Sequence, residues 1–307
     1  MAKISSGKVS PWFLVVVAAL LTAVISIGLM KFVDEVPSLG ASSEQSQLSY
    51  QRIVSLSPAM TETLVALGAA DRLAGISDYC ATHPALEGKR RVGTGLTPNL
   101  EGIVGVQPDS IVVEATSLAN YSNLEAMAET KPLAWLTLEE VMASINTLGE
   151  MTGHVEEARA LTGRIETRLK VDEPKEGPRV LVLIGLSAFE GGSLWYIKRS
   201  SLHGAAMHAA GAINAVSDEG SGAPSLSVEA LLRIDPDIII TMVSQAELTE
   251  ADRDAHIERL SRMNMLTAVK NQKLGFLVGE HCMSTGPSIL RLADELEAEL
   301  ERLSGDS

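Results

Sequence analysis

The chain has 307 residues and a mass of 32.6 kDa, enough for two ordinary domains or one large α/β unit. Hydrophobic residues make up 46% and charged residues 21%, which excludes disorder as the main state. The net charge of −14 and the 4% aromatic content argue against nucleic-acid binding, because phosphates are repelled and bases find few stacking partners. Two cysteines are too few for a disulfide scaffold or an all-cysteine zinc site.

An uncharged apolar run extends from Trp12 to Met30 near the start of the chain. At about 1.5 Å per residue, its length nearly crosses a hydrocarbon core of about 30 Å. A cleavable signal usually has a shorter apolar stretch, although the small residues Ser38, Gly40 and Ala41 could support cleavage. The sequence therefore predicts that residues 1–33 form an inner-membrane anchor or a removed signal, and it leaves both open.

The charges on either side of this run predict its orientation. Lys3 and Lys8 precede it, whereas Asp34 and Glu35 follow it. Because basic residues stay on the cytoplasmic side, we expect the remaining chain to be periplasmic or otherwise extracytoplasmic. Residues 34–50 are rich in Ser and Gln, which is typical of a linker between an anchor and a soluble body.

The soluble body contains a repeat. Residues 99–113 (NLEGIVGVQPDSIVV) and 227–241 (SVEALLRIDPDIIIT) share a glutamate, a Pro-Asp pair and a β-branched run at matching positions. Each copy predicts a short helix that stops before proline, a turn, and a strand buried on both faces as in a parallel sheet. Two copies 128 residues apart indicate two lobes of similar build.

Each lobe also begins with a predicted strand, at residues 52–56 and 179–184. In the first lobe, Ser57-Pro58 and Gly68 bracket a helix by the usual start and stop signals, and Glu62 is expected to face solvent. A 3.6-residue apolar period over residues 138–170 predicts one long helix, which Gly149 and Gly153 could bend or break.

These elements predict an α/β fold of two Rossmann-like lobes joined by one long rigid helix, with a ligand cleft between the lobes. The expected N-terminal lobe is 51–137, the connecting helix is 138–172, and the C-terminal lobe is 173–307. A stiff connection limits how far such a cleft can open, so we expect a ligand clamp of small amplitude.

Four segments carry a resemblance to a known family: RIVSLSPAMTETLVALGAADRLAGISDYC, VGTGLTPNLEGIVGVQPDSIVV, SLSVEALLRIDPDIII and LGFLVGEHCMSTGPSILRLADELEAEL. They resemble the helical-backbone (class III) substrate-binding proteins of ABC importers for cobalamin, haem and iron-siderophore complexes, and most closely the cobalamin-binding branch. The resemblance runs from Arg52 to Leu303. It implies an ABC permease dimer with ATPase subunits as partner, and we expect the binding protein itself to be a monomer.

The resemblance implies permease docking by one glutamate on each lobe, which by motif position are Glu101 and Glu229. A simpler explanation also exists for Glu229. Ser227 is placed as a helix N-cap, so Glu229 falls in the first helical turn, where the helix dipole favours a carboxylate by about 0.3–1 kcal/mol. The matching positions in the two lobes favour docking.

Loops after the strands should line the cleft, because ligands of open α/β sheets bind at the carboxyl ends of strands. The predicted ligand-binding residues are Asp78, Tyr79, Cys80, Trp195, Tyr196, Glu280, His281 and Cys282. The resemblance places Tyr79 where the cobalamin branch has a stacking tyrosine, and Glu280 close to an acidic contact. However, Gly95 and Ala223 replace two tryptophans of that branch. A corrinoid is therefore the expected ligand, with haem or a ferric siderophore as the alternative.

The two cysteines leave four interpretations open: free thiols beside the cleft, contact with a metal or metal-chelate, an interlobe disulfide, or burial far from the site. Spacing gives no metal motif, so we expect neither a resident metal nor a cofactor. His203 and His208 are expected to be ordinary helix residues. His154 and His256 are expected on solvated faces.

The sequence lacks a G-x-S-x-G elbow, a P-loop and an H-E-x-x-H motif, so we expect a binding protein and not an enzyme. A membrane-anchored receptor or sensor that is not coupled to import remains the alternative of another class. The matched glutamates argue against it, because an isolated sensor needs no pair of docking carboxylates.

Overall fold

The structure is a computed structural model, and it describes residues 49–171, 176–186, 193–217, 224–244 and 248–305. One compact unit runs from Leu48 to Ser307. The predicted anchor and nearly all of the predicted linker lie outside the described residues. Among the residues that are described, no helix combines the length and apolar character needed to cross a membrane.

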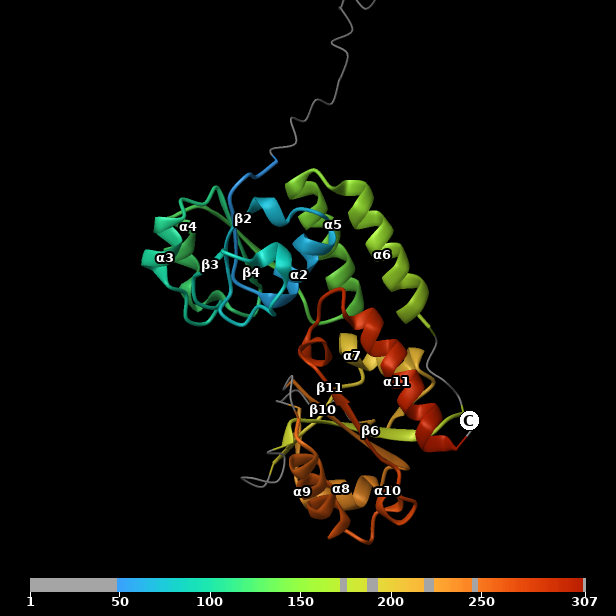
Figure 1. Ribbon diagram of the computed structural model, residues 1–307. Helices are drawn as coiled ribbons and strands as arrows, with labels where there is room; N and C mark the ends of the chain where they lie inside the picture. Colours follow the sequence, from blue (N-terminus) through green and yellow to red (C-terminus); the bar gives the residue numbers. More distant parts are fainter. Residues whose placement is uncertain (1–48, 172–175, 187–192, 218–223, 245–247, 306–307) are drawn as a thin grey trace, which may run out of the picture. The chain divides into compact units, whose positions relative to one another are not determined.

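The first lobe is built on a five-stranded parallel sheet with the order β3-β2-β1-β4-β5 (Figure 1). Its strands are β1 (Ile53–Ser55), β2 (Leu73–Ile76), β3 (Arg90–Arg91), β4 (Ser110–Glu114) and β5 (Glu129–Leu133). Its helices are α2 (Pro58–Ala66), α3 (Leu100–Gly105) and α4 (Tyr121–Glu125), with 3-10 turns η1 (Ala70–Arg72), η2 (Pro84–Leu86) and η3 (Leu118–Asn120).

The second lobe has a four-stranded parallel sheet with the order β11-β10-β6-β8 and a short antiparallel pair β7-β9. The strands are β6 (Arg179–Ile184), β7 (Leu194–Trp195), β8 (Ile213–Asn214), β9 (Ser225–Leu226), β10 (Ile238–Val243) and β11 (Leu274–Val278). The helices are α7 (Leu202–Ala209), α8 (Val228–Ile234), α9 (Glu250–Ser261), α10 (Thr267–Lys270) and α11 (Ile289–Ser304), with a 3-10 turn η5 (Glu280–Met283).

The two sheets share one topology. In the first lobe, β1 lies between β2 and β4, and β4 follows the Pro-Asp turn. In the second lobe, β6 lies between β8 and β10, and β10 follows the Pro-Asp turn. The order β2-β1-β4-β5 therefore corresponds to β8-β6-β10-β11. β3 is an additional edge strand of the first lobe. The prediction of two similar α/β lobes is therefore confirmed.

The Pro-Asp turns are built by the same contacts in both lobes. Asp109 accepts hydrogen bonds from the backbone N–H groups of Gln51 and Arg52, at 2.7 and 3.0 Å, and Asp237 accepts one from Arg179 at 2.8 Å. Each aspartate thereby ties the turn to the start of the lobe's first strand. These charge-assisted bonds explain why Pro-Asp recurs in both lobes.

An arginine at the start of the first strand completes each turn. Arg52 donates to the carbonyl oxygens of Val106 and Gln107, and Arg179 donates to those of Ile234 and Asp235. These carbonyls end the short helices, where backbone acceptors lack helical partners. Gln107 and Asp235, each just before the proline, both adopt a left-handed backbone with φ of 46° and 42°.

The prediction of one long connecting helix was wrong. The segment forms two helices, α5 (Leu138–Thr152) and α6 (Val155–Leu169), which lie side by side in Figure 1. Gly153 adopts a left-handed conformation with φ 78°, and its N–H bonds back to Glu150, which ends α5. The 3.6-residue period continues across this break because both helices bury one face, so periodicity alone did not reveal it.

The helical pair is packed tightly and ties the lobes together. A Cβ atom on Gly149 would lie 2.5 Å from the Cβ of Ala158, so glycine is needed where α5 approaches α6. At the far end of α6, Arg168 pairs with Asp294 and Glu297 of α11 at 3.0 and 2.6 Å. One continuous apolar core includes side chains of both lobes and of both connecting helices. This continuity limits the relative motion of the lobes.

Candidate functional site

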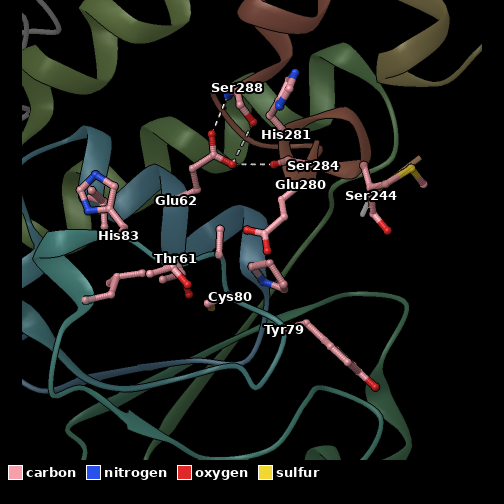
Figure 2. A pocket seen from close by; sticks show the side chains of 16 residues that line it. Thr61, Glu62, Tyr79, Cys80, His83, Ser244, Glu280, His281, Ser284 and Ser288 are labelled. Atoms are coloured by element: carbon pink, nitrogen blue, oxygen red, sulfur yellow. Dashed lines mark hydrogen bonds between the residues drawn. The ribbon is translucent and has the colours of Figure 1, made fainter. Parts of the chain in front are cut away.

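A cavity of about 570 Å³ lies between the lobes (Figure 2). Its first-lobe wall consists of α2 and the loop that follows β2, and its second-lobe wall consists of Ser244 after β10, η5 and the segment after η5. The lining residues are Pro58, Thr61, Glu62, Val65, Tyr79, Cys80, Ala81, Thr82, His83, Leu86, Ser244, Glu280, His281, Met283, Ser284 and Ser288. Its volume lies in the usual range for small-molecule sites, about 300–1,000 Å³.

The first-lobe loop is held from behind. Asp78 accepts a hydrogen bond from the N–H of Gly93 at 2.9 Å, and the Arg91 guanidinium donates to the carbonyls of Ser77, Asp78 and Cys80. These bonds fix the loop while the Tyr79 side chain remains 79% exposed at the cavity. Asp78, a predicted ligand contact, therefore supports the loop and does not line the cavity.

The second-lobe wall presents Glu280, His281 and Met283 from a single 3-10 turn after β11. Glu280 is exposed and makes no hydrogen bond or ion pair with any described residue. Cys282 is fully buried and lies behind the wall. The structure therefore brings Tyr79, Cys80, Glu280 and His281 together around one cavity, although they come from loops about 200 residues apart.

Glu62 connects the two lobes across this cavity (Figure 2). Its carboxylate accepts hydrogen bonds from the Ser284 hydroxyl at 2.5 Å, from the Ser288 backbone N–H at 2.5 Å, and from the Ser288 hydroxyl at 3.1 Å. Nearby, the Trp135 indole N–H donates to the carbonyl of Thr285 at 2.9 Å. The expectation that Glu62 faces solvent was wrong, because its partners come from the other lobe.

Trp195 and Tyr196, two other predicted ligand contacts, do not line this cavity. Trp195 belongs to β7, which pairs with β9, and its side chain is 47% exposed. Tyr196 is 8% exposed and packs in the apolar cluster on the outer face of the second sheet. The short β7-β9 pair holds Trp195, and Tyr196 follows directly, with its N–H bonded to the carbonyl of Pro224.

The two predicted docking glutamates occupy equivalent exposed positions. Glu101 lies in the first turn of α3, where the Asn99 side chain caps the N–H of Gly102 at 2.9 Å. Glu229 lies in the first turn of α8, where Ser227 caps the N–H of Ala230 at 3.2 Å. A hydrogen bond from Ser227 lowers the pKa of Glu229, so its carboxylate is charged at neutral pH.

The histidines divide into buried and cavity-facing groups. His203 is buried with Nε2 2.9 Å from the Cys282 carbonyl, and His256 is buried with Nε2 3.0 Å from the Thr241 hydroxyl. Burial lowers the pKa of both rings. The expectation that His256 lies on a solvated face was wrong. The cavity residue His83 accepts a hydrogen bond at Nδ1 from the N–H of Ala85, which leaves its Nε2 as an N–H donor in the neutral ring.

Both cysteines are free thiols in buried positions. Cys80 lines the cavity and Cys282 does not. Burial raises the pKa of the Cys80 thiol, and burial together with the Glu295 charge raises that of Cys282 to about 11. Both are therefore protonated at neutral pH in this state, and the structure does not contain the interlobe disulfide that the sequence left open.

Comparison with known proteins identifies the family. The family model described as periplasmic binding protein matches residues 53–277. The chain is 27% identical over 254 residues to a cobalamin-binding protein of Halobacterium salinarum, covering 78% of this chain but just under two thirds (66%) of that protein. It is 26% identical over 267 residues to a vitamin B12-binding protein of Pectobacterium carotovorum, covering 84% of this chain and 91% of that protein.

The fold is also found among solved structures. The periplasmic vitamin B12-binding protein of Vibrio cholerae superposes with a TM-score of 0.66 at 21% identity, covering 83% of this chain and 98% of that one. This similarity extends over both lobes and supports the same architecture. Because the family model covers well over half of the sequence, the chain belongs to the periplasmic binding protein family, a family of solute-binding proteins.

Proposed function

We propose that this protein captures a corrinoid in the interlobe cavity and delivers it to an ABC permease from the extracytoplasmic side of the membrane. The observation that carries the choice of ligand is the charge of the cavity. None of its sixteen lining residues is Lys or Arg, and two of them, Glu62 and Glu280, are carboxylates. Residues 187–192, 218–223 and 245–247, which the structure does not describe, contain no Lys or Arg either.

This charge distribution disfavours anionic metal-chelates. Haem carries two propionates and ferric citrate carries free carboxylates, and buried anions need cationic or N–H partners to offset their desolvation. Facing Glu280, such a ligand would be repelled. A corrin ring has a periphery of neutral amides around a cationic cobalt centre, so the ring meets no such penalty in this cavity, and the single phosphodiester of cobalamin lies on the nucleotide arm and not on the ring periphery.

The lining groups match the hydrogen-bonding chemistry of an amide periphery. Glu280, which has no partner among the described residues, offers acceptor oxygens for amide N–H groups, and the Nε2–H of His83 offers a donor for amide carbonyls. Tyr79, with its side chain 79% exposed at the cavity, offers a flat apolar face with a polar tip to the ring system. The two relatives described above are named for binding cobalamin or vitamin B12, which supports the same ligand class.

The two matched glutamates support delivery to a permease. Glu101 and Glu229 are exposed on equivalent helices of separate lobes, and so could contact two permease subunits at once. The continuous core keeps the lobes nearly fixed, which preorganises the cavity and reduces the ordering cost of binding. An N-terminal anchor or signal, as the sequence predicts, would place the protein beside such a permease.

A titration of the purified full-length chain tests the ligand. Cyanocobalamin, cobinamide, haem and ferric citrate would each be added while calorimetry and visible absorbance are followed. We expect saturable binding of the corrinoids and none of haem or ferric citrate. Glu280→Lys should weaken corrinoid binding, whereas Glu87→Lys, an exposed glutamate after η2 outside the cavity, should not. Tight haem binding without corrinoid binding would overturn the proposal.

A further inference from the structure

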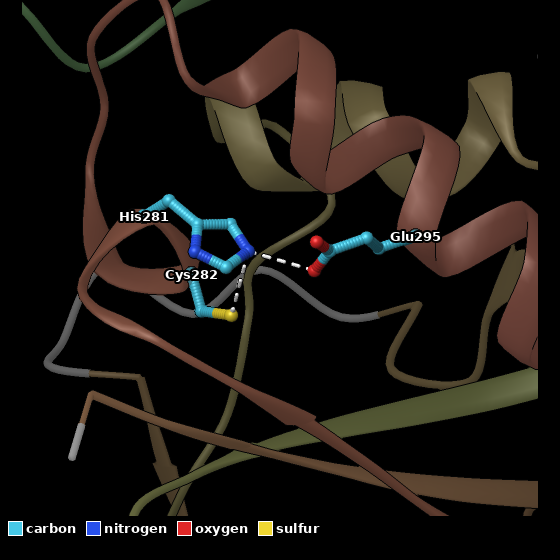
Figure 3. Close-up of side chains that lie close together, drawn as sticks. All are labelled: His281, Cys282 and Glu295. Carbon is cyan, nitrogen blue, oxygen red and sulfur yellow. Dashed lines mark hydrogen bonds and ion pairs between the residues drawn. The ribbon is translucent and has the colours of Figure 1, made fainter. Parts of the chain in front are cut away.

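We propose that His281, Cys282 and Glu295 form a binding site for a divalent transition-metal ion of the Zn²⁺ type, directly behind the second-lobe wall of the cavity (Figure 3). The three side chains come from two elements, η5 and α11. The site shares one residue with the cavity lining, His281, but it does not rest on the corrinoid proposal, because metal binding by the three donors is measured without a corrinoid.

The donor atoms already lie near metal-binding distances. His281 Nε2 is 2.7 Å from Glu295 Oε2 and 3.6 Å from Cys282 Sγ, and all three atoms lie within 4.8 Å of one another. In a tetrahedral zinc site with bonds of about 2.0–2.3 Å, donor atoms are about 3.3–3.6 Å apart. The His–Cys separation therefore fits as it is, the His–Glu separation needs to widen by about 0.6 Å, and the Cys–Glu separation, which is within 4.8 Å, needs to narrow by at most about 1.2 Å.

The chemistry of the three donors selects a class of ion. Imidazole nitrogen, thiolate sulfur and carboxylate oxygen together suit Zn²⁺ and its neighbours, whereas Mg²⁺ and Ca²⁺ prefer oxygen alone. The side chains of His281 and Glu295 are 12% and 32% exposed, and Cys282 is buried beneath them. A cation can therefore enter from the solvent side and would keep a fourth position for water or another ligand.

The surrounding groups hold these donors in place. A Cβ atom on Gly279 would lie 2.5 Å from Nδ1 and Cε1 of His281, so glycine, with φ 146°, lets the ring fold back toward α11. His203 holds the Cys282 carbonyl, and Arg291 binds Glu295 Oε1 at 2.8 Å, which leaves Oε2 directed at the site. Metal ligands are typically oriented by such hydrogen bonds.

Binding requires a defined proton balance. The Cys282 thiol proton is released to solvent, and the ring proton of His281 resides on Nδ1 so that Nε2 can coordinate the ion. Thiolate and carboxylate then supply two negative charges against the two positive charges of the ion. The competing interpretation is a hydrogen-bonded His281–Glu295 pair that binds no metal.

Cobalt titration of the purified full-length chain, reduced and freed of metal, distinguishes these interpretations. We expect one equivalent of Co²⁺ to produce a thiolate-to-cobalt charge-transfer band, which Zn²⁺ then abolishes by displacement. The band should be absent in Cys282→Ser and His281→Ala, and Co²⁺ affinity should fall about tenfold in Arg291→Ala, which removes a supporting hydrogen bond. Glu295→Gln should weaken binding further than Arg291→Ala.

Matched controls keep the result specific. Cys80→Ser removes the other thiol and Glu301→Gln changes an exposed carboxylate further along α11, and both should retain the band. Circular dichroism shows whether each variant is folded, and His281→Ala, a partly exposed site, provides the test if Cys282→Ser does not fold. Absence of the band in the unmodified chain, or its loss in Cys80→Ser, would overturn the proposal.

Discussion

The two lobes are alike in the parts that build the sheets and different in the parts that form the cavity. In both lobes an arginine stands at the start of the first strand, and a capped short helix precedes a Pro-Asp turn that is held by matching hydrogen bonds. The cavity walls have no such correspondence. The first lobe contributes α2 and the loop after β2, whereas the second contributes η5 after β11.

This difference separates two roles within one duplicated scaffold. The repeated helices carry Glu101 and Glu229. If these residues dock onto two permease subunits, as proposed, they need equivalent positions on the two lobes. The unrepeated loops line the cavity, and a ligand bound there would have no reason to be symmetric. Under the proposed function, the part that would recognise a transporter is duplicated, whereas the part that would recognise a solute differs between the lobes.

The largest expected effect comes from breaking the symmetric pair. The double variant Glu101→Arg and Glu229→Arg should abolish ligand uptake by cells, because both proposed docking contacts would become repulsive toward cationic groups of the permease. Each single variant should retain partial uptake. Ligand affinity should be unchanged, because neither residue lines the cavity.

Uptake of labelled corrinoid by cells that express the transporter provides the measurement. Glu150→Arg on α5 and Glu301→Arg on α11, both exposed, form the matched double control and should transport normally. Uptake by the Glu101 and Glu229 double variant at the control rate would show that docking uses other surfaces.

The sequence predicted the repeated features well because each is a local signal. The N-cap Ser227, the Pro-Asp turns and the buried strands all follow from a few neighbouring residues. Of the cavity, it identified Tyr79, Cys80, Glu280 and His281 as ligand-contact candidates, and these residues do line the cavity.

The features that sequence reasoning missed depend on contacts between distant segments. Glu62 meets Ser284 and Ser288 more than 220 positions away, and nothing near Glu62 signals that partnership. Likewise, Glu295 joins His281 only because α11 folds back over η5. The sequence did allow the prediction that the helix ends at Gly153, since glycine commonly ends helices in the left-handed conformation.

The next largest effect is expected from removing the carboxylate of Glu62, which links the two cavity walls. Glu62→Ala should lower the free energy of unfolding by about 1–3 kcal/mol, because it leaves the Ser288 N–H and two hydroxyls without their acceptor. Glu62→Gln should cost less, since its amide oxygen still accepts one of these bonds.

Urea unfolding of the ligand-free protein measures this change, with a lower midpoint expected at an unchanged slope. Glu87→Ala, which removes an exposed glutamate of the first lobe, is the control. If Glu62→Ala matched that control, the two lobes would be held by the helical pair and the apolar core without help from this contact.

The smallest expected effect is a pH dependence of stability that differs between the two lobes. The two buried histidines among the described residues, His203 and His256, both belong to the second lobe. Burial lowers the pKa of His256 below its usual 6.5, so at acid pH the unfolded chain binds a proton that the folded chain does not. The free energy of unfolding should therefore be unaffected well above pH 6.5 and fall as the pH drops through that value toward the folded-state pKa.

Hydrogen exchange read peptide by peptide tests whether this loss is confined to one lobe. Below pH 6.5, segments from β10 and α9, which contain Thr241 and His256, should lose protection before segments from β1 and α2. His256→Gln can keep a hydrogen bond to Thr241 without titrating, so it should reduce the pH dependence in the second lobe and leave the first unchanged. An equal pH response in both lobes would mean that the shared core through α5 and α6 makes them open as one unit, and that the likeness of their sheets extends to their stability.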